Sequence, residues 1–231
     1  MTKSSRGALI VVEGLDRAGK SSQCERLLRG LLDANYKAKY IRFPDRSTPT
    51  GKLIDSYLRG DTQLDDHAVH LLFSANRWEK AQSIRDDIAD GITVIIDRYS
   101  YSGAVYSTAK NIPGLSLDWA WHPEVGLPRP DLSLFLSISP DEAARRGGYG
   151  GERYETNAMQ TSVRELFTYL VRLPHNDEFC VVDAGKAFDE VADLIFQRVV
   201  ECLNKIDSLG PLRIFGPTSF IPEKCAESSA S

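Results

Sequence analysis

Five short apolar segments are spaced along the chain, and each is followed by a segment with helical periodicity. The apolar segments, each predicted as a short buried strand, cover residues 8–13, 37–42, 92–97, 132–138 and 178–183, and the run at 92–97 suits a strand buried on both faces. The periodic segments, each predicted as a helix, cover residues 21–34, 52–59, 67–90, 99–110, 140–146, 157–171 and a last stretch that ends near residue 203.

This alternation predicts an α/β fold, a five-stranded parallel sheet with helices on both faces. Ligands of such sheets bind beyond the carboxyl ends of the strands. Residues 111–130 are rich in Gly, Pro and Trp, so we expect irregular structure there, apart from a turn of helix at 117–121. We expect one domain over residues 1–207 and a loosely ordered C-terminal tail over 208–231, where the periodic pattern stops.

The composition is that of an ordinary globular protein, with 42% hydrophobic and 26% charged residues among 231. The net charge of −4 argues against a protein that coats nucleic acid or an anionic membrane, so local positive charge must hold any anionic ligand. The four cysteines form neither a disulfide framework nor a zinc motif, which favours a reducing compartment, cytoplasmic or nuclear. No apolar run approaches the roughly 20 residues of a transmembrane helix.

Residues 14–21, GLDRAGKS, match the phosphate-binding pattern G-x-x-x-x-G-K-[ST], directly after a predicted strand and before a predicted helix. The glycines let backbone N–H groups close around phosphate oxygens. Lys20 can bridge the terminal phosphates, and the Ser21 hydroxyl can ligate Mg²⁺. This segment therefore predicts a site for a nucleoside triphosphate.

Two charged residues inside this loop have separate predicted roles. Arg17 is placed to stabilise charge on the phosphoryl group in transfer, an effect of about 10³–10⁵ in rate in other systems. The alternative for Arg17 is a solvated loop arginine. Asp16 would be repelled by a triphosphate, so we expect it to face the hydroxyl of a second substrate or to cap the loop.

Further candidate residues lie outside the loop. Asp97 ends the third predicted strand, where a carboxylate associated with Mg²⁺ is expected, and the adjacent Arg98 could converge with Arg46 on one phosphate group. Two surface salt bridges are the alternative for these arginines. Phe73 and Arg77 share one face of the predicted long helix and would suit a nucleobase, although spacing alone favours a core position for Phe73.

Six colinear segments resemble the eukaryotic thymidylate kinase (dTMP kinase) family. They are EGLDRAGKSSQ at 13–23, RFPDRSTPTGKLIDSYL at 42–58, DHAVHLLFSANRWE at 66–79, DRYSYSG at 97–103, VGLPRPDL at 125–132 and RRGGYGGERYE at 145–155. The resemblance implies the fold of a P-loop nucleoside monophosphate kinase. It also implies Mg²⁺-dependent transfer of the γ-phosphoryl group of ATP to dTMP, which gives ADP and dTDP.

The resemblance implies roles for individual residues around dTMP. Phe73 would stack on thymine, which reverses the preference for a core position, and Arg77 would bond to its O4 edge. Arg46 and Arg98 would hold the phosphate group. The other implied contacts are Asp16 and Tyr154 at the 3′-hydroxyl, Ser102, Gly103, Tyr106 and Gln160 around the base and sugar, and Phe43 and Leu58 as an apolar wall.

On the donor side, the resemblance implies an ATP site, catalytic groups and a metal site. The implied ATP contacts are Gly14, Arg17, Ala18, Gly19, Lys20, Ser21 and Ser22, with Arg146 and Lys186 beside adenine. The implied catalytic residues are Arg17, Lys20, Asp97 and Arg98, with Ser21 and Asp97 at the metal.

The resemblance also implies larger features of the molecule. The glycine-rich segment 147–151 would belong to a lid over about residues 140–156 that closes over ATP. Arg17 matches the branch of the family with its catalytic arginine in the phosphate loop, although Arg145, Arg146 and Arg153 leave the division of labour with the lid open. A cis peptide bond at residues 43–44 and a homodimer through helices, for which the long helix is available, are implied as well.

Three alternatives remain at this stage. Residues 204–207 spell the guanine-reading N-K-x-D of GTPases, but they follow a predicted helix rather than a strand. A deoxynucleoside kinase would need a carboxylate base in place of the arginine pair. His67 and His70 could pair as metal ligands, but the sequence places no further ligand nearby.

Overall fold

The secondary structure follows the predicted segments closely. The computed structural model describes residues 6–146, 153–154, 156–173 and 179–217. The strands are β1 (Leu9–Gly14), β2 (Ala38–Arg42), β3 (Thr93–Asp97), β4 (Leu132–Ser137) and β5 (Phe179–Asp183). The α-helices are α1 (Lys20–Asp33), α2 (Pro49–Arg59), α3 (Asp66–Ala89), α4 (Ser100–Thr108), α5 (Leu117–Trp121), α6 (Pro140–Arg145), α7 (Asn157–Val171) and α8 (Phe188–Leu203), and the 3₁₀ helices are η1 (His122–Glu124) and η2 (Ile206–Leu209).

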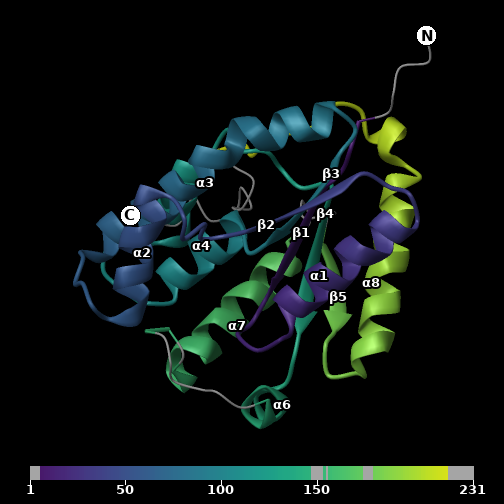
Figure 1. Ribbon diagram of the computed structural model, residues 1–231. Coiled ribbons are helices and arrows are strands. Elements are labelled where there is room, and N and C mark those ends of the chain that lie inside the picture. Colours follow the sequence, from purple (N-terminus) through teal and green to yellow (C-terminus); the bar gives the residue numbers. More distant parts are fainter. Residues whose placement is uncertain (1–5, 147–152, 155, 174–178, 218–231) are drawn as a thin grey trace.

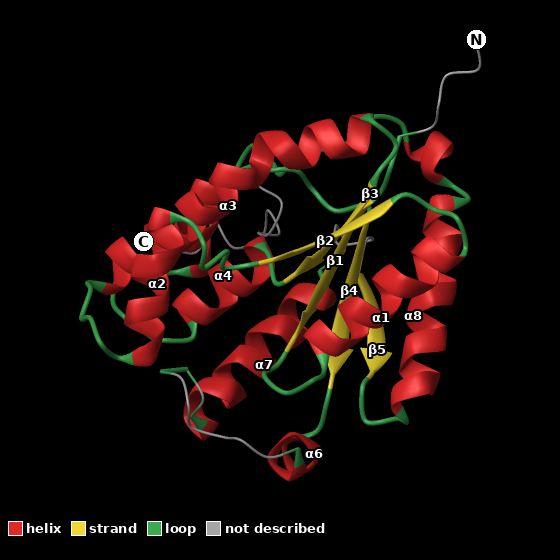
Figure 2. Ribbon diagram, viewed as in Figure 1, coloured by secondary structure: helices red, strands yellow, loops and turns green. Residues whose placement is uncertain are grey.

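The described strands form one five-stranded parallel sheet in the order β2-β3-β1-β4-β5, as predicted. Helices α1 and α8 lie on one side of the sheet, and α3, α4 and α7 lie on the other (Figures 1 and 2). The first strand is central, because Val12 lies beside Asp97 of β3 and beside Leu134 of β4. The carboxyl end of β1 is therefore flanked by two other strand ends.

Burial differs between the central and the edge strands. Every residue of β1 and β3 is buried, which explains their unbroken apolar sequences. The prediction that all five strands are buried was wrong for β2 and β5, whose residues are mostly half-buried or exposed. These two strands form the edges of the sheet, and each has a strand neighbour on one side alone.

Residues 209–217 pack against the domain, whereas the sequence predicts a loosely ordered tail from residue 208 onward. Backbone N–H groups of residues 126, 129 and 215 donate to the carbonyls of 215, 213 and 127, each over 2.9 Å. Phe215 is fully buried. Its ring lies against those of Tyr99, Tyr101 and Trp121. Burial of this aromatic ring outweighs the polar composition around it, so the domain extends past the expected boundary at residue 207. Residues 218–231 lie outside the described part of the chain.

The N-K-x-D sequence lies at the end of a helix, as expected. Asn204 is the C-cap of α8, and Asp207 lies in η2. Arg6, three residues before β1, donates through Nε to the carbonyl of Gly210 over 2.7 Å, so this region lies near the amino end of the sheet. It is therefore remote from the strand ends that hold the phosphate loop. Among the described residues, no helix is long and apolar enough to span a membrane.

Candidate active site

The phosphate loop connects the carboxyl end of β1 to the first turn of α1. Gly14 has φ of 147°, and a Cβ there would lie 2.6 Å from the carbonyl oxygen of Leu136, so a side chain has no room. Gly19 takes the left-handed conformation (φ 85°) at the N-cap of α1. The buried Lys20 follows it and donates through Nζ to the carbonyl of Leu15 over 2.6 Å. The local backbone thus provides the predicted cradle for phosphate oxygens, with an ammonium group inside it.

Asp97 ends β3 beside the phosphate loop. Ser21 donates through Oγ to Asp97 Oδ2 over 2.5 Å, and the Tyr40 hydroxyl donates to the same oxygen over 3.2 Å. Asp97 Oδ1 is buried and accepts no hydrogen bond from any described residue. A buried carboxylate oxygen without a donor, next to a hydroxyl, fits a hard cation that takes oxygen ligands. Ser21 and Asp97 therefore fit the predicted Mg²⁺ site.

Arg98 joins the phosphate loop to the neighbouring helices. Its backbone is left-handed (φ 64°), and its N–H donates to the carbonyl of Val12 over 3.1 Å. The guanidinium forms an ion pair with Asp16 and donates through Nη1 to the Tyr106 hydroxyl over 3.3 Å. Gln160 of α7 donates through Nε2 to the other carboxylate oxygen of Asp16 over 2.6 Å. Arg98 and Asp16 are thus held together beside the phosphate loop.

The charges of this group shift its pKa values. Burial, together with the positive charge of Arg98, lowers the pKa of Lys20 to about 8. Burial acts to raise the pKa of Asp16, but Arg98 and Lys20 outweigh it and hold this pKa below its ordinary value. At neutral pH Lys20 and Arg98 therefore place two positive charges at the phosphate loop, beside the carboxylates of Asp16 and Asp97, and these cations suit a phosphate group.

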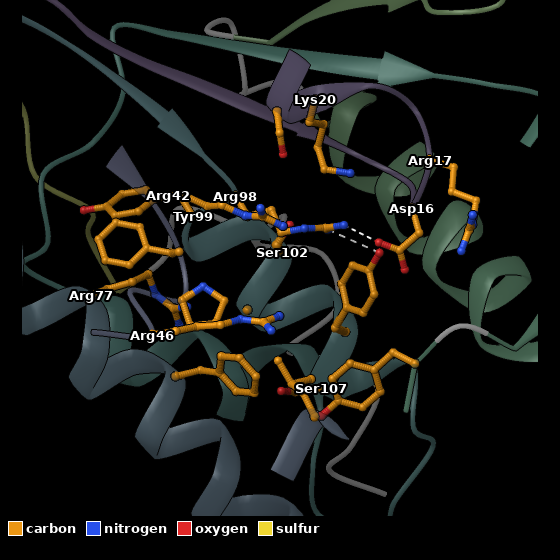
Figure 3. Close-up of a pocket in the computed structure, with 18 of the residues that line it drawn as sticks. Asp16, Arg17, Lys20, Arg42, Arg46, Arg77, Arg98, Tyr99, Ser102 and Ser107 are labelled. Atoms are coloured by element: carbon orange, nitrogen blue, oxygen red, sulfur yellow. Dashed lines mark hydrogen bonds and ion pairs between the residues drawn. The ribbon is translucent and has the colours of Figure 1, made fainter. Parts of the chain in front are cut away.

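One cavity of about 360 Å³ begins at the phosphate loop and extends between α2, α3 and α4 (Figure 3). Its walls combine cationic, aromatic and hydroxyl side chains. The lining residues are Asp16, Arg17, Gly19, Lys20, Ser21, Ser22, Arg42, Phe43, Pro44, Arg46, Leu58, Phe73, Arg77, Arg98, Tyr99, Ser102, Gly103, Tyr106, Ser107 and Tyr154. A ligand in this cavity would therefore lie in continuous contact with the phosphate loop.

The two predicted base-binding residues meet in this cavity. Phe73 is half-buried and packs beside the apolar cluster that contains Leu58. Arg77, one turn later on α3, is buried and forms a two-point ion pair with Glu124 of η1, with N···O distances of 2.7 and 2.6 Å. Phe73 is thus partly in the apolar cluster and partly at the wall of the cavity.

Comparisons with known proteins decide the family. The family profile for thymidylate kinase matches residues 12–195. The chain belongs to the thymidylate kinase family. It is 48% identical to the thymidylate kinase of Danio rerio and 47% identical to that of Homo sapiens, and each alignment covers 80% of this chain and 86% of the relative. A solved thymidylate kinase from Candida albicans superposes with a TM-score of 0.77 at 41% identity over 88% of this chain and 94% of that one.

Membership in the thymidylate kinase family confirms the predicted α/β fold and the enzyme class. Most of the predicted site residues line the cavity described above. Of the remainder, Gln160 acts through its hydrogen bond to Asp16, and Asp97 lies behind Ser21. Gly14 and Ala18 shape the loop without lining the cavity, and Arg146 and Lys186 do not line it either. The Phe43–Pro44 bond is cis, as the resemblance to thymidylate kinases implies.

Arg146 and Arg153, which lie on either side of residues 147–152, contact different parts of the molecule. Arg146 donates through Nη1 to the carbonyl of Arg17 over 3.1 Å and through Nη2 to that of Ala184 over 2.5 Å, which links the phosphate loop to the loop after β5. Lys186 is exposed in that second loop. Arg153 instead lies over the ring of Tyr57 at 4.3 Å and donates to its carbonyl over 3.1 Å. Residues 147–152 and 155 of the predicted lid lie outside the described residues.

Sequence reasoning missed several residues of the site. Arg42, Pro44, Tyr99 and Ser107 also line the cavity. Glu124 lies in the segment predicted to be irregular, where no periodicity marks a buried carboxylate. His67 and His70 are not a metal pair: the ring of His67 packs on Trp119, and His70 is buried with Nδ1 2.7 Å from Ser107 Oγ. The described residues contain no cluster of three or more potential metal ligands.

Proposed function

We propose that this chain transfers the γ-phosphoryl group of ATP to dTMP and releases ADP and dTDP. The observation that carries the proposal is the continuity of the cavity, because the phosphate loop with Lys20 and the pocket with Phe73 and Arg77 share one space. An acceptor bound by its base at Arg77 would point its phosphate group toward the loop. A phosphoryl group could then pass between two phosphates without crossing solvent.

On the acceptor side, Phe73 stacks on thymine and Arg77 donates to the O4 edge of the base. Arg46 and Arg98 bind the monophosphate, and the Asp16 carboxylate accepts from the 3′-hydroxyl of the sugar. Arg46 reaches the cavity from the loop before α2, where its Nη1 also lies 2.6 Å from Asp55 Oδ1. The remaining contacts proposed for dTMP are Phe43, Leu58, Ser102, Gly103, Tyr106, Tyr154 and Gln160.

On the donor side, the backbone of residues 14–22 holds the ATP phosphates and Lys20 neutralises the charge on the terminal groups. Arg17 stabilises the charge that develops during transfer. Arg146 and Lys186 lie on the adenine side, since Arg146 already contacts the carbonyl of Arg17.

Ser21 and Asp97 would hold Mg²⁺ with the phosphates of ATP. The unpartnered Oδ1 of Asp97 supports this assignment among the described residues. When bound, the cation supplies charge neutralisation for the phosphoryl oxygens. Tyr40 holds the opposite carboxylate oxygen of Asp97 through its hydroxyl and so orients the group.

A deoxynucleoside kinase would need a free carboxylate base at the acceptor hydroxyl. Glu13 at the end of β1 and Asp16 in the loop after it already accept hydrogen bonds from protein donors. Asp16 is paired with Arg98 and bonded to Gln160. Glu13 is fully buried and accepts hydrogen bonds from the backbone of Tyr99 and Ser102 and from the Ser102 hydroxyl. This arrangement favours a phosphate acceptor over a hydroxyl acceptor.

A steady-state assay that couples ADP release to a reporter enzyme tests the proposal. With ATP and Mg²⁺, dTMP should be turned over, while thymidine should not. Lys20→Met serves as the inactive control, because it removes the loop cation and keeps a side chain of similar length. Turnover of thymidine but not of dTMP would show that the acceptor is a hydroxyl and that the proposal is wrong.

We also propose that the protein acts as a homodimer through α3 in the cytoplasm. Leu71 and Trp78 lie seven residues apart on this helix and expose 47% and 41% of their surface, so they offer an apolar stripe. Light scattering should give twice the mass of one chain for the wild type, and Leu71→Glu should shift the mass to that of one chain. A monomeric wild type would exclude the dimer.

A further inference from the structure

Glu124 lies in η1, a segment for which the sequence predicts no function, and its carboxylate binds the guanidinium of Arg77. Its side chain is fully buried, and both carboxylate oxygens are used by Arg77, through Nε over 2.7 Å and Nη2 over 2.6 Å. The preceding carbonyl, that of Pro123, accepts from Ser74 Oγ over 3.1 Å and from Trp78 Nε1 over 2.7 Å. The turn that carries Glu124 is thus fastened to α3 on both sides of Arg77.

Gly103 of α4 packs against the same guanidinium and restricts its position from another side. A Cβ on Gly103 would lie 2.5 Å from Arg77 Nη2 and 2.9 Å from both Cζ and Nη1. These distances are far below an ordinary contact, so the guanidinium rests directly against the backbone of α4. Hydrogen bonds from Arg77 to Glu124 therefore hold the guanidinium in place. Because Gly103 has no side chain, the guanidinium can pack directly on the backbone of α4.

The ion pair with Glu124 determines which N–H groups of Arg77 can donate to a ligand. Nε and one N–H of Nη2 donate to Glu124, while Nη1 makes no hydrogen bond to any residue in the part of the chain that the structure describes. Arg77 borders the cavity (Figure 3). A guanidinium nitrogen can only donate. A carbonyl oxygen on a base is therefore a partner for Nη1, whereas an exocyclic amino group would set donor against donor.

The buried ion pair between Arg77 and Glu124 is not explained by its contribution to the stability of the fold. Burial of two charges carries a desolvation cost that their attraction only partly returns, and apolar residues of similar volume often replace such pairs without loss. Burial acts to raise the pKa of Glu124, but the charge of Arg77 outweighs it and keeps this pKa below its usual value. The carboxylate thus stays ionised and holds its partner in one orientation.

We propose that Glu124 is a positioning residue that orients Arg77 so that the site accepts pyrimidines with a carbonyl oxygen at position 4 and rejects those with an amino group there. This inference rests on the proposed function, in which Arg77 contacts that edge of the base. Glu124 itself touches the arginine and not the base. Its removal should therefore change recognition of the acceptor and leave recognition of ATP unchanged.

Glu124→Gln is the direct test, because the amide is similar in shape but offers one acceptor and turns a second N–H toward Arg77. With ATP and Mg²⁺, the KM for dTMP should rise about 10-fold or more, the scale of a misplaced charged hydrogen bond. The ratio of kcat/KM for dTMP over dCMP should fall by a similar factor, while the KM for ATP should not change. In the background of Arg77→Ala, the same substitution should add no further effect on either quantity.

Asp131→Asn is the matched control. Asp131 is also a buried carboxylate paired with an arginine, since Arg6 donates to it over 2.7 and 2.8 Å. It lies immediately before β4 and does not border the cavity. This variant should lower the melting temperature without a change in the KM for dTMP or in the preference over dCMP. The Asp131→Asn variant therefore distinguishes a loss of protein stability from a loss of the orientation of Arg77.

Gly103→Ala keeps the proposal testable if Glu124→Gln does not fold. Alanine favours a helix more than glycine does, and the added methyl group would displace the guanidinium of Arg77. The KM for dTMP should again rise and the preference over dCMP should fall. A folded Glu124→Gln with wild-type KM and preference, or an equal effect of this substitution without Arg77, would overturn the positioning role. If the wild type does not phosphorylate dTMP, the proposed function fails instead.

Discussion

Replacement of Phe215 by alanine is expected to lower the free energy of unfolding by about 3–5 kcal/mol, the cost of removing a large aromatic from a closed core. The side chain is fully buried, and its ring centroid lies 4.7 Å from that of Trp121, 5.6 Å from that of Tyr101 and 6.2 Å from that of Tyr99. The variant would leave a void between these three rings. In a chain of this size 1 kcal/mol corresponds to about 2–4 °C, so the Tm should fall by about 6–20 °C.

Ile214→Ala is the matched control, because it removes an apolar side chain from the adjacent residue of the same segment. Ile214 is 59% exposed, so its truncation should change stability by no more than about 0.5 kcal/mol. Urea unfolding followed by Trp fluorescence and by circular dichroism measures both variants against the wild type. Equal stability of the two variants would refute the reasoning, because it would mean that Phe215 contributes no more than an exposed neighbour.

Three further predictions concern the active site. Arg17→Ala should lower kcat about 10³-fold or more with little change in the KM for dTMP, and an unchanged kcat in a rapid-quench assay would remove Arg17 from catalysis. The Kd for ATP, measured by titration calorimetry, should rise as the pH passes about 8, because Lys20 then loses its proton and its charge. Lys20→Met should bind ATP with no such pH dependence, and a flat wild-type profile would contradict the lowered pKa. Ser21→Ala should raise the Mg²⁺ concentration that gives half-maximal activity, and an unaltered titration would show that this hydroxyl does not take part in cation binding.

The parts of this fold that follow from the sequence are those with local causes. The strands β1 and β3 are buried on both faces, so their apolar runs appear directly in the sequence. The phosphate loop needs glycines and a lysine at set spacings within a few residues, so its motif is complete in one segment. The long helix carrying Phe73 and Arg77 shows no Gly or Pro before its end, and its bounds were close to those of α3.

The parts that do not follow depend on partners far apart along the chain. Nothing near Glu124 in the sequence indicates that Arg77 will pair with it, because η1 has no periodicity and the contact arises only when α3 packs beside it. Phe215 lies in a polar segment whose composition resembles that of a disordered tail. The three rings around it come from α4, from α5 and from the residue before α4, so only the assembled fold shows that the tail has a place to bind.

The strand order also governs when the chain can acquire its activity during folding. Leu9 of β1 pairs beside Val94, and Ile10 pairs beside Leu132, so the central strand finds its neighbours only in distant, later parts of the chain. Closing such large loops precedes the gain from pairing, which makes folds of this kind slower than those built from local contacts. The phosphate loop stands near the beginning of the sequence, yet its supporting strand ends come from β3 and β4. A nascent chain should therefore gain nucleotide affinity only after β4 has been synthesised and has left the ribosome.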